Sequence, residues 1–186
     1  HYGGFRTVVS HFVPADGEKW TADHPVLSWR LDKVLVGDLD KGVLTYDGNV
    51  YRDEKGELYL FYCVAAPARS GPADIDIVAC RMKDPGNIDP AFRPRVVLSG
   101  QKLRSEDRNP GFIQLVEGAV VQELGGKYVL FYSVGDFMLD NYKIGVAFSD
   151  AMMPPEGRQY EKVLIPDPDN LWKNDRADRE VKYLLQ

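Results

Sequence analysis

An internal repeat with a period of about 70 residues is the feature that most limits the folds open to this chain. The segment YDGNVYRDEKGELYLFYC begins at Tyr46, and its counterpart VEGAVVQELGGKYVLFYS begins 70 residues later, at Val116. Two further patterns recur with similar spacing: a strand followed by a turn, from Arg6, Ile77 and Gly145, and a short apolar run, from Pro25, Val96 and Lys162. A fixed period of this kind indicates a repeat architecture such as a propeller or an array.

Each full copy of the repeat contains four runs rich in β-branched and aromatic residues, bounded by Gly, Pro, Asp and Asn, as strands are. Four antiparallel strands in a radially repeated unit describe one blade of a β-propeller. The sequence therefore predicts an all-β chain of four-stranded antiparallel blades that holds about half of a ring. We expect outer strands of one blade at 1–30, full blades at 43–100 and 113–166, and a connection toward a further blade at 167–186.

The longer connections of this predicted propeller gather on one face. In an up-and-down blade, the loops after the second and fourth strands lie on the face opposite to the tight turns. These loops are the longer ones here, at 28–45, 65–74, 99–115 and 135–141. Because binding and catalytic residues concentrate on loops that a rigid scaffold holds, this face is the predicted functional face.

Charge and cysteine content exclude some functions. The net charge of −5 and the lack of a basic stripe argue against nucleic acid as a partner. No apolar run reaches the roughly 20 residues of a membrane-spanning helix, so no membrane partner is expected. Cys63 and Cys80 lack the spacing of a metal or redox site and are interpreted as two buried thiols, with a cross-strand disulfide as the alternative.

Two carboxylates stand at matching places in the repeat. Asp47 and Glu117 each head a first strand, each is followed by Gly, and each comes after a long loop of the functional face. The first strand of a blade is the innermost, so both side chains are predicted to reach one central funnel. Asp-Gly is also a common turn dipeptide, and a lone Glu is usually solvated. Their shared register favours a functional pair of the kind that glycosidases use.

Together these segments resemble the five-bladed propeller of glycoside hydrolase family 43, which contains arabinofuranosidases, arabinanases and xylosidases. The resemblance covers residues 43–154 and rests on the Glu-Gly step, the aromatic second strand and the GVAFS third strand. It implies that Glu117 is the general acid, and that Asp47 adjusts the pKa of this acid and orients the substrate. It also implies an Asp general base at the head of an earlier blade, but no inner strand with such an Asp precedes Asp47.

The resemblance implies an inverting glycoside hydrolase that acts on arabinose- or xylose-containing oligo- or polysaccharides. This chain is then a fragment without the base, inactive by itself. The alternatives are a non-catalytic carbohydrate-binding propeller remnant and a propeller that binds proteins. Neoagarooligosaccharide hydrolases and invertase-like enzymes share the propeller, although the invertase-like motif has Cys where Gly118 stands.

Further expectations concern the partners of this site. Sugar contacts are expected from functional-face side chains, namely Arg69, Arg104, Arg108 and Phe137. No cofactor and no metal ligand are expected in the chain, and a structural calcium would belong to the complete propeller. Another chain or a further segment is expected to complete the ring. The resemblance favours a secreted or periplasmic protein, although no signal peptide pattern is present.

Overall fold

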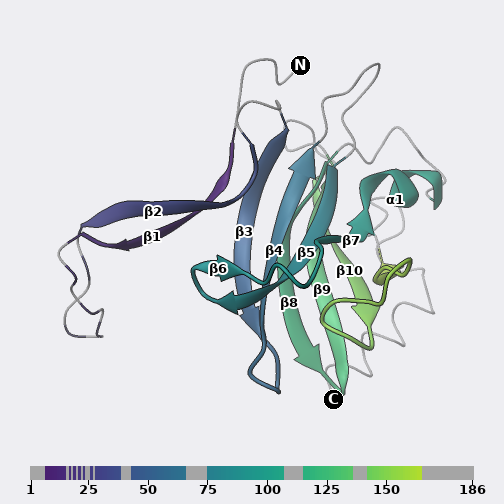
Figure 1. Cartoon of the computed structure of the whole chain (residues 1–186). Helices are drawn as coiled ribbons and strands as arrows, with labels where there is room; N and C mark the ends of the chain where they lie inside the picture. The colour runs from purple at the N-terminus through teal and green to yellow at the C-terminus, as the bar shows by residue number, and fades with distance from the viewer. Residues whose placement is uncertain are drawn as a thin grey trace.

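The computed structural model of the chain describes residues 7–15, 17, 19, 21, 23, 26, 28–38, 43–65, 75–106, 115–135 and 142–164. These residues form antiparallel strands and one short helix, α1 (Gly100–Glu106), as Figure 1 shows. No helix among them is both long and apolar enough to cross a membrane. The predicted all-β architecture is therefore confirmed in the described part of the chain.

The first sheet corresponds to the first full repeat. Its strands are β3 (Leu44–Arg52), β4 (Leu58–Ala65), β5 (Ile75–Asp84), β6 (Asn87–Ile88) and β7 (Arg95–Ser99). The order is β3-β4-β5, with β6 and β7 both paired to β5 at different places along it. The outermost strand of this sheet is therefore interrupted, with the short β6 near the end of β5 and the longer β7 nearer its start.

The second sheet repeats this arrangement without the interruption. Its strands are β8 (Leu115–Leu124), β9 (Lys127–Gly135), β10 (Lys143–Ser149) and β11 (Glu161–Leu164). They follow one another as antiparallel neighbours from β8 to β11. β8 packs against β3, β4 and β5, so the inner strands of the two sheets are neighbours in space as well as equivalents in the repeat.

Side chains on successive residues of a strand point to opposite faces of the first sheet, and they form two hydrophobic cores. In β4, Phe61, Cys63 and Ala65 are buried toward the second sheet, whereas Leu60 and Tyr62 are buried on the opposite face. Side chains of a strand alternate between faces, so one apolar strand can serve both cores. Burial on both faces is what the near-continuous apolar composition of β4 and β5 requires.

Close packing in the core of the second sheet depends on Gly145. This glycine of β10 pairs with Tyr132 of β9, whose ring is fully buried. A Cβ added to Gly145 would overlap the Tyr132 ring. A glycine at this position therefore leaves space for the aromatic side chain on the neighbouring strand.

A hairpin formed by β1 (Val9–Pro14) and β2 (Trp29–Val36) covers the other face of the first sheet. The prediction placed the second of these strands at 25–29 and a connection after it, which is wrong, because β2 begins at Trp29 and extends to Val36. The predicted run opens on Pro25, which has no N–H to donate to a ladder, whereas Trp29 to Val36 pair with β1, with two shifts of register.

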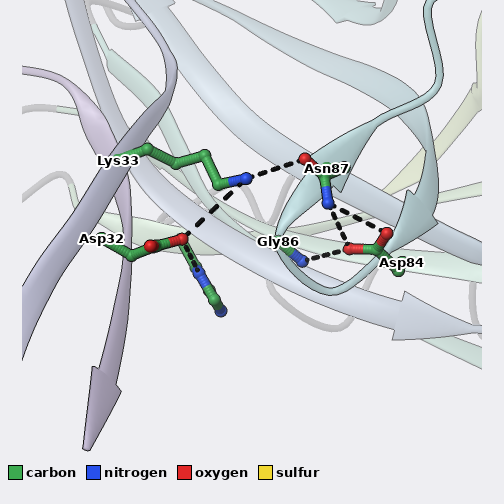
Figure 2. A network of polar contacts seen from close by, with 6 residues as sticks. Asp32, Lys33, Asp84, Gly86 and Asn87 are labelled. Carbon is green, nitrogen blue, oxygen red and sulfur yellow. Dashed lines mark hydrogen bonds and ion pairs between the residues drawn. The ribbon is translucent and has the colours of Figure 1, made fainter.

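Polar contacts attach this hairpin to the turn between β5 and β6, as Figure 2 shows. Lys33 Nζ of β2 donates to Asn87 Oδ1 at 2.8 Å, and Asn87 Nδ2 donates to both carboxylate oxygens of Asp84 at 2.8 and 2.9 Å. On the hairpin itself, His11 Nδ1 lies 3.0 Å from Asp32 Oδ2. The bond from Lys33 to Asn87 links two segments that lie 54 residues apart in the sequence.

Two further predictions are settled by the sheet geometry. Cys63 and Cys80 are free and buried on opposite faces of the first sheet, so the alternative of a cross-strand disulfide is wrong. Helix α1 lies in a segment that was expected to be only a loop. Its Leu103 is 2% exposed and belongs to the core between the sheets, which explains why a short helix forms there.

Candidate active site

A β-bulge interrupts each inner strand where it carries its acidic residue. In β3, Asp47 and Gly48 stand between the pairs Tyr46–Cys63 and Asn49–Phe61, so two residues oppose the single residue Tyr62. β-bulges bend a strand and redirect its side chains, and they are frequent next to active sites.

The equivalent bulge of β8 consists of Gly118 and Ala119, which we call the β8 bulge. These residues stand between the pairs Glu117–Ser133 and Val120–Phe131. Glu117 is therefore the last residue of β8 paired in register before the bulge.

The two carboxylates differ in register by one position, which corrects the prediction that they occupy the same place. The first residue of each bulge has a positive φ: 52° for Asp47 and 66° for Gly118. By hydrogen-bond register, Asp47 is thus the counterpart of Gly118, and Glu117 is the counterpart of Tyr46.

The structure nevertheless brings the two acidic residues together. The backbone N–H of Gly118 donates to Asp47 Oδ2 at 3.1 Å, across the interface between the sheets. Asp47 is exposed and Glu117 is partly buried, so both lie where a soluble substrate can reach them.

Two tyrosine hydroxyls surround the Glu117 carboxylate. Tyr142 Oη donates to Glu117 Oε1 at 2.8 Å. Burial raises the pKa of Tyr142, and the hydrogen bond to Glu117 adds to this effect. Burial also raises the pKa of Tyr46, with further contributions that include the charge of Glu117 and a hydrogen bond to it. Both phenols therefore stay protonated near neutral pH and can donate to the carboxylate.

Cys63 lies beneath this group and is not a nucleophile. Its thiol is fully buried, and burial raises its pKa to about 12, with the charges of Asp47 and Glu117 acting in the same direction. Since the thiolate is the reactive form of cysteine, this side chain is inert at neutral pH. The chemistry that the arrangement supports is proton transfer by a carboxylic acid next to a second carboxylate.

A second set of contacts joins β3 to the β8 bulge. Tyr51 Oη donates to the Ala119 carbonyl oxygen at 2.7 Å, and Asn49 Nδ2 donates to the same oxygen at 3.3 Å. Neither residue was singled out in the sequence, and nor were Tyr46 and Tyr142. These four residues lie near the acidic pair because of the bulges and the packing between the sheets. The sequence of the repeat does not indicate either feature.

The remaining predicted site residues stay predictions. Arg69, Arg108 and Phe137 lie outside the described residues. Arg104 lies in α1, but its side chain is not described. In the described part of the chain, no group of three or more His, Cys, Asp or Glu side chains is arranged to hold a metal ion.

Solved structures share the fold of this chain. A thermostable family-43 glycoside hydrolase has a TM-score of 0.59 and 19% identity, over 79% of this chain and 45% of that one. An α-L-arabinofuranosidase from Lactobacillus brevis has a TM-score of 0.60 and 20% identity, over 87% and 46%. A xylan β-1,4-xylosidase from Bacillus halodurans has a TM-score of 0.50 and 18% identity, over 75% and 22%.

The comparisons establish similarity of structure only. No protein-family model matches the sequence, and the search of curated proteins gives no match. The chain spans less than half of the length of each of the three structures. At these identities the similarity shows the fold alone. Over the part that it shares with them, the chain has the five-bladed β-propeller fold of the family-43 glycoside hydrolases and holds about half of the ring.

Proposed function

We propose that this chain is part of an inverting glycoside hydrolase that cleaves arabinose- or xylose-containing oligo- or polysaccharides. In this proposal Glu117 is the general acid that protonates the leaving oxygen. Asp47 is the neighbouring carboxylate that orients the acid and the sugar. Arg69, Arg104, Arg108 and Phe137 are proposed to contact the substrate from the functional face.

The observation that carries the proposal is the hydrogen bond that places Asp47 beside the residue after Glu117, across two neighbouring inner strands. Asp47 Oδ2 accepts a hydrogen bond from the backbone N–H of the residue directly after Glu117, at 3.1 Å. A turn aspartate would bond within its own loop, and a solvated glutamate would have no ordered partner. Here the aspartate bonds across sheets and the glutamate accepts from Tyr142. The names of the fold neighbours, an arabinofuranosidase and a xylosidase, support the choice of sugars.

The proposal requires a third carboxylate. Inverting hydrolysis needs a general base that activates water on the face of the sugar opposite to the acid, about 6.5–9.5 Å away. Of the described inner strands, β3 contributes Asp47 to the site and β8 contributes Glu117. The base is therefore proposed to come from another part of the complete propeller, and the second candidate function is sugar binding without cleavage.

Product stereochemistry tests the proposal. A protein that holds this chain in a complete propeller is incubated with arabinose- and xylose-containing oligosaccharides, and the first-formed anomer is identified by proton NMR. We expect an inverted product and its loss in Glu117→Gln and Asp47→Asn variants. A retained product would contradict the mechanism. Sugar binding by a complete propeller that releases no product would favour the second candidate.

A further inference from the structure

Three hydrogen bonds join one edge of β3 to the β8 bulge. Asp47 Oδ2 accepts from Gly118 N at 3.1 Å, while Asn49 Nδ2 and Tyr51 Oη both donate to the Ala119 carbonyl, at 3.3 and 2.7 Å. The three β3 residues that make these bonds, Asp47, Asn49 and Tyr51, alternate along one strand. Together they hold both residues of the bulge from the neighbouring sheet.

The Ala119 carbonyl needs such partners because of where it lies. Ala119 is 0% exposed, and it falls in the two-residue stretch of β8 that has no register partner on β9. A buried carbonyl without a hydrogen bond is strongly destabilising. Asn49 and Tyr51 both supply this oxygen with donors from the neighbouring sheet.

Tyr51 is itself held in place. Its ring meets the ring of Phe61 edge to face, with centroids 5.5 Å apart and an interplanar angle of 88°. Burial raises the pKa of Tyr51, so the hydroxyl remains a neutral donor. A rigid donor on a packed ring fixes the carbonyl more firmly than a mobile side chain could.

Glu117 directly precedes the bulge, so the path of the backbone at Gly118 and Ala119 sets where its carboxyl group points. We infer that Tyr51 and Asn49 are positioning residues for Glu117 and act through the backbone of the β8 bulge. This inference rests on the proposed role of Glu117 as the acid. It adds that residues of one blade align the acid of the next.

The first test needs no activity and uses the chain itself. Tyr51→Phe removes only the hydroxyl, and Tyr59→Phe is its matched control. Tyr59 is also partly buried and pairs with Tyr51 across the strands, but its hydroxyl donates to Glu57 Oε2 at 3.0 Å and not to the β8 bulge. We expect hydrogen exchange of the Gly118 amide to rise about 3- to 10-fold in Tyr51→Phe, the equilibrium effect of one hydrogen bond. It should stay unchanged in Tyr59→Phe.

The second test uses a complete propeller that contains the chain. A misaligned acid should slow kcat for natural oligosaccharides about 10-fold while KM and the rate on nitrophenyl glycosides change little, since a good leaving group needs little protonation. Asn49→Ala should have the same signature with a smaller loss, because its contact is longer. Tyr51→Phe in a Glu117→Ala background should cause no further loss.

The outcomes separate the inference from the proposed function. Unchanged Gly118 exchange in Tyr51→Phe would overturn the inference whether or not the protein is a glycosidase. Faster exchange with equal losses on both substrates would also overturn it, because Tyr51 would then be only structural. If Glu117→Ala itself shows no dependence on the leaving group, the proposed function fails, while the exchange data still decide whether β3 holds the bulge.

Discussion

Asp47 occupies a backbone conformation that glycine usually fills. It has a φ of 52° and is the only non-glycine residue with a positive φ in the described part of the chain. The left-handed conformation costs a typical L-residue roughly 1–2 kcal/mol, although Asp tolerates it better than most. The counterpart position in the second sheet is Gly118. A strained conformation beside a candidate site is a reason to test whether the carboxylate is needed there.

This strain predicts an unusual order of stability among variants of Asp47. Asp47→Gly and Asp47→Ala both remove the carboxylate and its bond to Gly118, but only glycine fits the positive φ without strain. We expect the glycine variant to be more stable than the alanine variant by about 1 kcal/mol in urea unfolding. The control compares Asn49→Gly with Asn49→Ala. The φ of Asn49 is not positive, so alanine should be the more stable replacement there. An alanine variant at least as stable as the glycine variant at position 47 would contradict the assigned conformation.

Asp47 and Glu117 could be identified from the sequence because each stands before a glycine and an apolar strand in a repeated unit. The offset of one position between them could not be predicted, because a bulge shifts the strand register without changing the pattern of residue types in the sequence. Tyr142 could not be identified either. It comes close to Glu117 only when β10 pairs with β9 and β9 with β8.

At the scale of elements, the β1–β2 hairpin depends on carboxylates for its polar contacts. The hydrogen bond from His11 holds the pKa of Asp32 below its ordinary value, and the bonds from Asn87 and Gly86 do the same for the pKa of Asp84. A group whose pKa is lowered by folding stabilises the folded state above its ordinary pKa of 3.8. This stabilisation is lost as the pH falls through the lowered value.

Acid should therefore loosen the hairpin. We expect the exchange protection of β1 and β2 amides, corrected for the intrinsic rate, to stay constant down to about pH 5 and to fall below about pH 4, as the carboxylates become protonated. Asp32→Asn should reduce this protection at pH 6 and weaken its dependence on pH. The control is Asp150→Asn, since the pKa of Asp150 is also lowered, by Lys127, but in the second sheet. Equal pH dependence of the hairpin in wild type and Asp32→Asn would contradict this account.

Strand composition predicted most elements, and the exceptions have local causes. The strands β4, β5, β9 and β10 were predicted because runs of aromatic and β-branched residues bounded by turn residues are visible in the sequence. The position of β2 was missed because an exposed hairpin arm has a weaker apolar pattern, with Trp29 to Lys33 all solvent-exposed. Helix α1 was missed because a single buried residue, Leu103, anchors it.

At the scale of the whole molecule, large apolar side chains of the β1–β2 hairpin and of the second sheet are exposed to solvent. Leu31 of the hairpin is 55% exposed and Ile144 of β10 is 62% exposed, and other large residues accompany them, namely Phe12, Trp29, Val34 and Val120. The interior faces, by contrast, pack into two continuous cores. Apolar surface of this kind is typical of a face that packs against another element.

The chain by itself is predicted not to hydrolyse aryl arabinofuranosides or xylosides at an appreciable rate. General base assistance typically supplies about 10²–10⁴-fold, and a partial funnel also loses substrate positioning. The measurement is nitrophenol release by the purified chain against buffer. Turnover well above background by the purified chain, free of contaminating enzyme, would show that these residues already include a base.

The role of Glu117 is tested most directly by comparing the loss of activity in Glu117→Ala on substrates with good and poor leaving groups. The quantity measured is kcat/KM in a complete propeller that contains the chain. Removal of the acid leaves water activation intact, so nitrophenyl glycosides should be cleaved almost normally, while natural oligosaccharides should lose about 10²–10⁴-fold. Asp47→Ala should reduce both, because it disturbs the acid and the orientation of the sugar. Equal losses on the two substrates for Glu117→Ala would show that Glu117 is not the general acid.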